Sequence, residues 1–179
     1  YAVPGSVVAV GILIPFAWLD STLNSWLHAN YGKIIGLVFS GTAFILIYAY
    51  VVRFLAVSFN TVEASLGKVT PSMDAASRTL GQTPAGTLKR VHTPIMRGSL
   101  FAAAILVFVD VMKELPATII LRPFNFDTLA IRAHTLASDE RLAEASTASL
   151  AIVLVGILPV ILLSMAMRRS RPGSKAKEG

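Results

Sequence analysis

Four apolar stretches, each close to the length that crosses a lipid bilayer, constrain this sequence more than any other feature. They lie at residues 3–19, 34–55, 100–121 and 150–167. A spanning helix needs roughly 20 mainly apolar residues, with about 17 to 25 as the working range. Only 15% of the 179 residues are charged, whereas a soluble domain averages about 25%. The stretches therefore predict an all-α, polytopic membrane protein with four visible spans.

The ends of the chain predict how it is divided. It begins Tyr1-Ala2-Val3-Pro4-Gly5, without a starting methionine or a basic signal region, so we expect a fragment whose earlier helices are missing. We expect a membrane domain at residues 1–168 and a basic, disordered cytoplasmic tail at residues 169–179. The sequence has no cysteine, which excludes a disulfide framework and a thiolate metal site.

Basic residues are distributed unevenly among the connections between the stretches. Eleven lie in or beside the 55–98 interval and the tail: Arg53, Lys68, Arg78, Lys89, Arg90, Arg97, Arg168, Arg169, Arg171, Lys175 and Lys177. Basic residues collect on the cytoplasmic side of a membrane. This rule, rather than nucleic-acid binding, explains the net charge of +6. We therefore expect residues 61–97 in the cytoplasm and residues 20–33 and 122–146 outside.

The 57–97 loop carries helix punctuation and, at about 40 residues, is too long for a simple connector. Thr70-Pro71 offers an N-cap and a first-turn proline for a short helix at 72–80. Gly81 can adopt the left-handed conformation that stops such a helix. Thr83-Pro84 then starts a second helix, which we expect to end before Pro94. The loop is therefore predicted to be a helical hairpin with a glycine turn.

One side of the first predicted helix is suited to contact another protein. Met73, Ala76 and Leu80 follow one another at i, i+3 and i+7, which gives an apolar stripe. The small residues Ala75, Ala76 and Ser77 would allow another backbone to approach closely. The alternative is that the hairpin packs only against its own helical bundle, and the spacing alone leaves both open.

The hairpin sequence resembles the EAA loop of ABC importer permeases. Met73-Asp74-Ala75-Ala76-Ser77-Arg78-Thr79-Leu80-Gly81, nine residues and Val91-His92-Thr93-Pro94 match the pattern Glu-Ala-Ala, three residues, Gly, nine residues, Ile-x-Leu-Pro. The distance from Gly81 to Pro94 fits the pattern. The acidic position falls on Ala75, with Asp74 one residue early, while Ser77 replaces the second alanine and Thr93 the leucine.

The resemblance implies the fold of a type I ABC importer permease, with the loop as its coupling-helix hairpin. In that family the coupling helix sits in a groove of a separate ATPase subunit, which pushes on it. The residues expected to dock the ATPase are Met73, Asp74, Ala75, Ala76, Ser77, Leu80, Gly81 and Pro94. The chain contains no Gly-x-x-x-x-Gly-Lys phosphate loop. We therefore expect ATP to be used by the partner ATPase and no cofactor to be bound by this chain.

The third apolar stretch contains charges that cannot all face lipid. Asp110, Lys113 and Glu114 are spaced at i, i+3 and i+4, which places them on one helix face. Each would cost roughly 2.5–3.5 kcal/mol near the bilayer centre. Pro116 follows and is expected to kink the helix. These four residues are predicted either to line a translocation path or gate, or to form an ion-pair network between helices.

A second resemblance, to the ferric-iron branch of ABC permeases, rests on the sequence after the loop. It is carried by Val111-Met112-Lys113-Glu114-Leu115-Pro116-Ala117-Thr118, by Leu121-Arg122-Pro123, by Phe126-Asp127-Thr128-Leu129-Ala130 and by Ala137-Ser138-Asp139-Glu140-Arg141. It implies a multi-pass permease of the bacterial inner membrane that imports ferric iron. It also implies ABC ATPase subunits, a periplasmic iron-binding protein and a second permease half as partners, with lipid around them and no nucleic acid.

Two rival functions remain open from the sequence. One is a type I permease for another substrate, such as sulfate, thiamine or a polyamine. The other is a membrane-embedded enzyme that uses Asp110 and Glu114 as acid and base. We expect no resident metal site, because His28, His92 and His134 lie in different loops without ligand spacing. The outer stretch 123–146 is expected either to dock a delivery protein or to pack on the ends of the bundle.

Overall fold

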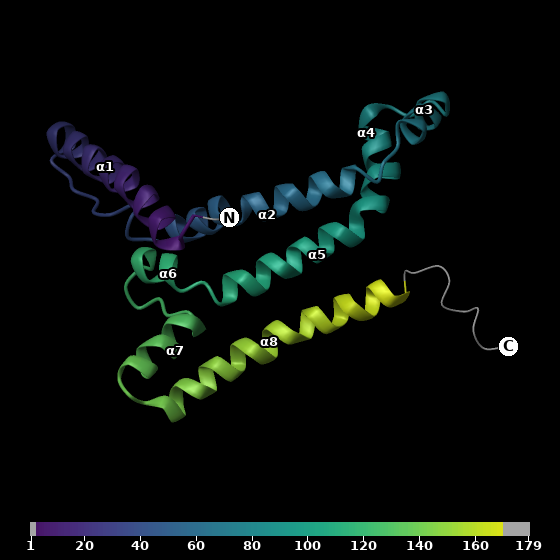
Figure 1. Cartoon of the computed structure of the whole chain (residues 1–179). Helices are drawn as coiled ribbons and strands as arrows, with labels where there is room; N and C mark the ends of the chain where they lie inside the picture. The colour runs from purple at the N-terminus through teal and green to yellow at the C-terminus, as the bar shows by residue number, and fades with distance from the viewer. Residues whose placement is uncertain (1–2, 170–179) are drawn as a thin grey trace. The chain divides into compact units, whose positions relative to one another are not determined.

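The computed structural model describes residues 3–169 and consists of helices joined by short connections (Figure 1). Four helices are long and apolar enough to cross a membrane: Gly5–Tyr31, Ala43–Leu66, Pro84–Met112 and Leu142–Leu162. Most of their surface is exposed, as it is on helices that face lipid. The predicted all-α, polytopic fold with four spans is confirmed. Of the predicted tail at residues 169–179, Arg169 ends the last helix, and residues 170–179 lie outside the described residues.

The chain divides into two compact units, each described by itself. The first contains residues 1–55 and 110–154, and the second contains residues 56–109 and 155–179. The first unit has the hydrophobic core, in which helix α1 (Gly5–Tyr31) packs against helix α6 (Pro116–Leu121). Its buried residues are Ala9, Ile12, Ile45, Leu46, Ala49, Ala117 and Leu121.

Helix α1 is longer than the predicted first span, because it continues through Asp20 to Tyr31. The expected placement of Asp20 in an outer loop is therefore wrong. Asp20 is 1% exposed, and its carboxylate accepts hydrogen bonds from the backbone N–H groups of Val38, Phe39 and Ser40. A buried carboxylate with this many donors is compensated, and for this reason the helix can extend past it.

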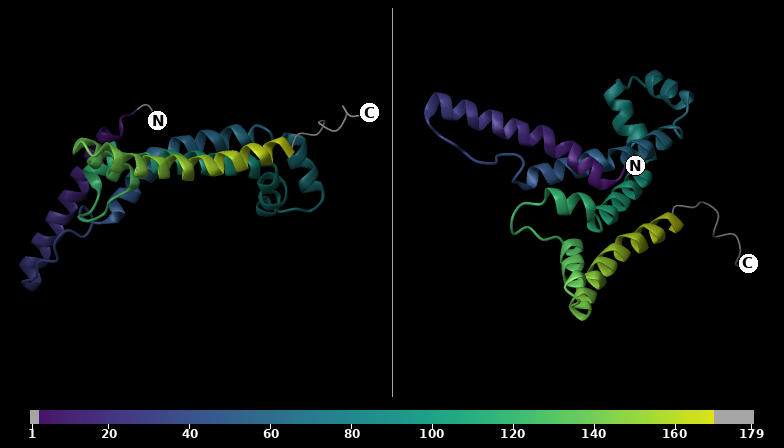
Figure 2. Two further views of the ribbon diagram at one scale, coloured as in Figure 1. Left: turned by 90° about the horizontal axis from the view of Figure 1, so that it is seen from below. Right: turned by 60° about the vertical axis from the view of Figure 1, so that its left-hand side comes forward.

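The segment at residues 32–42, which we call the strap, is not helical. The second span was expected to begin at residue 34, but helix α2 runs over Ala43–Leu66. Gly32 and Gly36 have φ of 65° and 79°, a left-handed conformation that interrupts any helix there. The strap instead turns back along α1 (Figure 2), where Asn24 accepts from the N–H of Ile35 and donates to the carbonyl of Gly36.

In the second unit, the predicted loop is mostly helix. Helix α3 (Pro71–Thr79) and helix α4 (Pro84–Thr87) form the two arms of the hairpin (Figure 1). The second arm was expected to end before Pro94, and this is wrong. It continues through a π-helical turn, η1 (Leu88–His92), directly into helix α5 (Thr93–Met112).

The π turn explains how the helix passes the proline. Pro94 has no N–H to donate, and its ring crowds the carbonyl four residues earlier in a regular α-helix. In η1 the N–H of Thr93 bonds the carbonyl of Leu88, five residues back. This wider turn, together with a 2.9 Å bond from Thr93 Oγ1 to the same carbonyl, accommodates Pro94 without ending the helix.

The predicted third span at residues 100–121 is two helices rather than one kinked helix. Helix α5 ends at Met112, and Pro116 is the first residue of the separate helix α6. Proline is favoured at this first position, where its missing N–H has no partner to lose. Helix α7 (Leu129–Ser138) and helix α8 (Leu142–Arg169) complete the described chain.

Candidate functional site

The inner side of the hairpin holds its two arms together by polar contacts. His92 Nε2 lies 2.7 Å from Asp74 Oδ1. The hydroxyls of Ser77 and Thr87, which are 4% and 6% exposed, are 2.8 Å apart. A buried hydroxyl pair satisfies both groups. Asp74 and Ser77 therefore fasten α3 to the second arm, which gives the displaced acidic residue of the loop motif a structural role.

The turn between the arms depends on Gly81. Its φ is 76°, and nothing lies within 4 Å of the position that a Cβ would occupy. The backbone conformation, rather than crowding, therefore favours glycine here. The N–H of Gly81 bonds the carbonyl of Arg78, and the N–H of Gln82 bonds that of Ser77. Thr83 then caps α4 by accepting from the N–H of Gly86, as the Thr-Pro sequence predicts.

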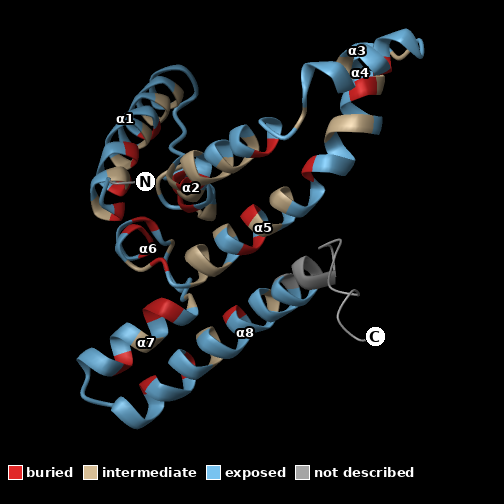
Figure 3. Ribbon diagram, turned by 45° about the vertical axis from the view of Figure 1, so that its right-hand side comes forward, coloured by how far each residue is buried: buried red, intermediate tan, exposed pale blue. Residues whose placement is uncertain are grey.

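The outer side of α3 carries the predicted apolar stripe. Met73 is 40% exposed, Leu80 is 79% exposed, and Ala76 between them is also exposed. Figure 3 shows the exposed surface of α3 and the buried residues where the arms meet. Ala75 is exposed as well, whereas Ser77 is buried against Thr87. The surface available to another protein is therefore narrower than the full set of predicted docking residues.

The charged residues of the third stretch take part in two ion pairs. Asp110 Oδ1 accepts from Lys113 Nζ at 2.9 Å, as their spacing predicts. Glu114 was expected on the same helix face, but it lies beyond the end of α5 and is only 6% exposed. Its partner is Arg53, whose Nε lies 3.1 Å from Glu114 Oε2.

Glu114 also bonds to the first turn of the next helix. Its Oε1 accepts from the backbone N–H of Ala117 at 3.2 Å, and its carbonyl accepts from Thr118 Oγ1 at 2.5 Å. Thr118 is fully buried, and its hydroxyl lies 2.5 Å from that of Tyr50 on α2. Both carboxylate oxygens are thus occupied, and the network connects α2 to the first turn of α6.

Gly5 lies directly against this ion pair. A Cβ at Gly5 would lie 2.5 Å from Glu114 Oε1 and 2.6 Å from Arg53 Nη1. Arg53 Nη1 also donates to the carbonyl of Val3 at 3.4 Å. The beginning of α1 therefore closes over the pair, and only a residue without a side chain permits this approach.

Sequence reasoning missed Arg53 as part of this network. Arg53 was assigned to the cytoplasmic side because the second apolar stretch ends at residue 55. In the structure α2 continues to Leu66, so Arg53 lies well inside the helix. An ionisable residue within a spanning segment usually faces a partner. The more polar residues after residue 55 continue the helix. This continuation was the signal that could have shown Arg53 to lie inside a helix and to need a partner.

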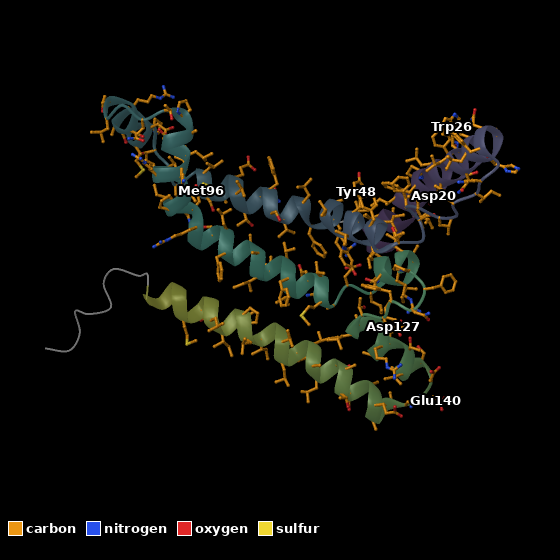
Figure 4. All side chains as sticks on the ribbon, turned by 180° about the vertical axis from the view of Figure 1, so that it is seen from behind. Asp20, Trp26, Tyr48, Met96, Asp127 and Glu140 are labelled. Atoms are coloured by element: carbon orange, nitrogen blue, oxygen red, sulfur yellow. The ribbon has the colours of Figure 1, made fainter. Side chains whose placement is uncertain are left out.

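Asp20 and Asn24 are a second polar site that the sequence did not indicate. They lie one turn apart on α1, and Figure 4 labels Asp20. Ser40 Oγ donates to Asp20 Oδ2 at 2.5 Å, in addition to the backbone donors of the strap. Successive N–H groups that converge on one carboxylate form an anion-binding nest, which here is occupied by the chain's own aspartate.

Oxygen and nitrogen ligands do not cluster elsewhere in the part of the chain that the structure describes. Within residues 3–169, no three His, Asp or Glu side chains come together in a way that would hold a metal ion. A hollow of about 370 Å³ lies beside the connection from α6 to α7, lined by Ile119, Arg122, Pro123, Phe124, Asn125 and Asp127. Arg122 and Asp127 form an ion pair at its edge.

The chain is similar to permease proteins of bacterial transport systems. The Fe(3+)-transport system permease protein FbpB 2 of Haemophilus influenzae is 30% identical over 181 aligned positions, which cover 89% of this chain and 36% of the relative. PhnV of Salmonella typhimurium, provisionally named a 2-aminoethylphosphonate transport system permease protein, is 26% identical over 174 positions, covering 97% of this chain and 59% of the relative.

The chain therefore spans between 36% and 59% of the length of these two relatives. A further Haemophilus influenzae protein, FbpB 1, provisionally named a ferric transport system permease, is 29% identical over 121 positions, which cover 68% of this chain and 17% of the relative. No family model matches the chain, and no solved structure matches it significantly.

Proposed function

We propose that this chain forms part of the membrane subunit of an ATP-driven importer. Its resemblance to ABC importer permeases is confirmed. The relatives are transport permeases rather than enzymes, and the four apolar helices are those of a multi-pass protein of the inner membrane. The alternative of a membrane-embedded enzyme is accordingly set aside. The subunit's activity would be transport by alternating access.

The observation that carries this proposal is the hairpin with its exposed apolar stripe. Met73, Ala76 and Leu80 face outward, while Asp74 and Ser77 fasten α3 to the second arm. The second arm continues without interruption from Pro84 to Met112. A push on α3 would therefore be transmitted along a helix that crosses the membrane, which is what a coupling element requires.

The second part of the proposal concerns the path through the membrane. Asp110, Lys113 and Pro116 surround the break between α5 and α6, and Glu114 is buried there against Arg53. Non-helical backbone at membrane depth is typical of a substrate path or gate. Because both oxygens of Glu114 are already engaged, we propose that it holds the gate in place and does not bind the substrate.

For the substrate we propose ferric iron. The support is the similarity to the Fe(3+)-transport system permease, together with the ferric-type sequence around Glu114 and Pro116. A second candidate is 2-aminoethylphosphonate, because the similarity to PhnV covers a larger share of both chains. Either substrate would be delivered by a periplasmic binding protein, and the membrane path would be completed by a second permease half.

Uptake by the reconstituted transporter tests the proposal. Full-length protein, its ATPase and its binding protein are placed in proteoliposomes, and entry of radiolabelled ferric iron is followed with and without ATP. We expect ATP-dependent iron entry that excess unlabelled 2-aminoethylphosphonate does not reduce. Entry of labelled 2-aminoethylphosphonate without iron would replace the ferric assignment by the second candidate. ATP-independent entry of both would contradict the importer itself.

A further inference from the structure

Four basic side chains lie in the second unit where α2 ends and α5 begins. We call this group the basic collar: Lys68, Lys89, Arg90 and Arg97, all exposed. Lys68 follows α2, and its Nζ donates to Ser99 Oγ on α5 at 2.9 Å. This bond places Lys68 beside the turn of α5 that carries Arg97.

The collar has little acidic compensation. Within the described residues 56–109, the acidic side chains are Glu63 and Asp74. Asp74 is engaged by His92. Lys89, Arg90 and Arg97 make no ion pair among the described residues. The collar is therefore a site of uncompensated positive charge that can accept an anion.

The position of the collar along α5 matches the boundary of a bilayer. After Arg97 the exposed side chains of α5 are apolar, and Phe101, Leu106 and Phe108 among them are large. From Lys89 to Arg97 the helix rises by about 12 Å at 1.5 Å per residue. The headgroup layer of a bilayer is roughly 5–8 Å deep on each side. The collar therefore has the extent needed to reach lipid phosphates next to the apolar region.

We propose that the basic collar binds the phosphate of an anionic phospholipid on the cytoplasmic side of the membrane. The proposal rests on the proposed function and on the orientation expected from the sequence, in which residues 61–97 lie in the cytoplasm. Arginine presents paired N–H donors that match a phosphate, and lysine adds a mobile charge. The apolar stripe on α3 is the surface proposed for the ATPase, so the collar at the base of the hairpin remains available to lipid.

Lipid binding to the full-length protein, purified in detergent without ATPase, binding protein or substrate, tests this proposal. Native mass spectrometry measures the affinity for short-chain phosphatidylglycerol and, as the neutral reference, phosphatidylcholine. The variant K89Q/R90Q/R97Q removes three collar charges. The matched control K33Q/R78Q/R132Q removes three exposed basic residues that lie outside the collar and make no ion pair among the described residues.

We expect the protein to prefer phosphatidylglycerol. Each basic residue near an anionic surface contributes about fivefold in affinity, so the collar variant should lose roughly a hundredfold. The control should change less than about twofold. Arg97→Gln alone, expected to lose about fivefold, carries the test if the triple variant does not fold.

Three results would overturn the proposal. One is equal affinity for the two lipids, and another is an equal loss in the collar variant and its control, which would indicate a general charge effect. The third is unchanged lipid binding in the collar variant, which would place the lipid site elsewhere. Because no transport is measured, failure of the lipid site leaves the importer proposal to be judged by its own uptake experiment.

Discussion

Arg53 Nε on α2 lies 3.1 Å from Oε2 of Glu114. Glu114 precedes the first residue of α6 by two positions. The two residues are far apart in sequence, and each lies in a stretch whose residues are mostly apolar. Their pairing connects α2 to α6 at the point where α5 has ended. The stability of this part of the first unit should therefore depend on both partners together.

Removing one partner of the Arg53–Glu114 pair should be more damaging than removing both. Arg53→Met or Glu114→Gln leaves the other charge without this partner, with an expected loss of about 3–5 kcal/mol in the free energy of unfolding. The double variant Arg53→Met/Glu114→Gln should lose clearly less than the sum. Denaturation in detergent micelles measures all of these. Strictly additive losses would mean that the pair is not coupled.

Gly5→Ala should destabilise the first unit, because its Cβ would lie 2.5 Å from Glu114 Oε1. Overpacking of this kind costs about 1–3 kcal/mol. Gly11→Ala on the same helix is the matched control, because nothing lies within 4 Å of its Cβ position. The control should be neutral or slightly stabilising. Thermal denaturation of both variants checks this, and equal melting temperatures would contradict the close approach of α1.

Gly81→Val should impair coupling between the ATPase and transport. A side chain at φ of 76° is strained, with a cost of about 1–2 kcal/mol, so the turn between the hairpin arms should deform. Gly81→Asn should retain much of the coupling, because asparagine tolerates the left-handed conformation. Substrate-stimulated ATP hydrolysis is the measurement, with Gly98→Ala as the control in open space. Full coupling in the valine variant would contradict a coupling role for the hairpin.

Substitutions at Leu80 and at Ser77 should impair different properties, namely ATPase binding and stability. Leu80→Glu puts a charge on the exposed apolar stripe, where it should weaken ATPase binding by on the order of tenfold and leave the melting temperature unchanged. Ser77→Ala removes a buried hydroxyl partner of Thr87, so it should lower stability by about 1–3 kcal/mol. Binding in detergent and thermal denaturation separate the two effects. If Leu80→Glu bound the ATPase normally, the docking face would lie elsewhere.

Asp20→Ala should release the strap from α1. The amides of Val38, Phe39 and Ser40 would lose their acceptor, and their hydrogen exchange should accelerate by about tenfold or more. Asn30→Ala is the control, because its side chain donates to the carbonyl of Trp26 within its own helix and makes no bond to the strap among the described residues. Hydrogen–deuterium exchange with mass spectrometry measures the strap peptide directly. Unchanged protection in the Asp20 variant would mean that other contacts hold the strap.

The sequence predicted features that depend on residues close together in the chain. The glycine turn at Gly81, the cap at Thr83 and the pair between Asp110 and Lys113 all follow from local spacing, and the structure contains each of them. The existence of four apolar helices follows from hydropathy alone. The identity of the ATPase-docking residues stays a prediction, as does the orientation of the chain in the membrane.

Features that depend on distant partners could not be predicted in this way. Hydropathy placed Asp20 and Arg53 at the ends of spans because charge is costly in lipid. It takes no account of the strap amides around Asp20 or of Glu114 beside Arg53, which remove that cost. Pro94 was expected to end the helix. The π turn that accommodates it has a wider hydrogen-bond pattern, and this pattern has no simple sequence signature.

The contacts of Asp20 also bear on how this part of the protein can diverge. Its donors at residues 38–40 are mainly main-chain N–H groups, which every amino acid except proline provides. Side chains at these positions are therefore open to mutational drift without loss of the anchor, although a serine hydroxyl adds one bond at residue 40. Related chains should accordingly vary along the strap, exclude proline from residues 38–40, and retain an acidic residue opposite them on α1.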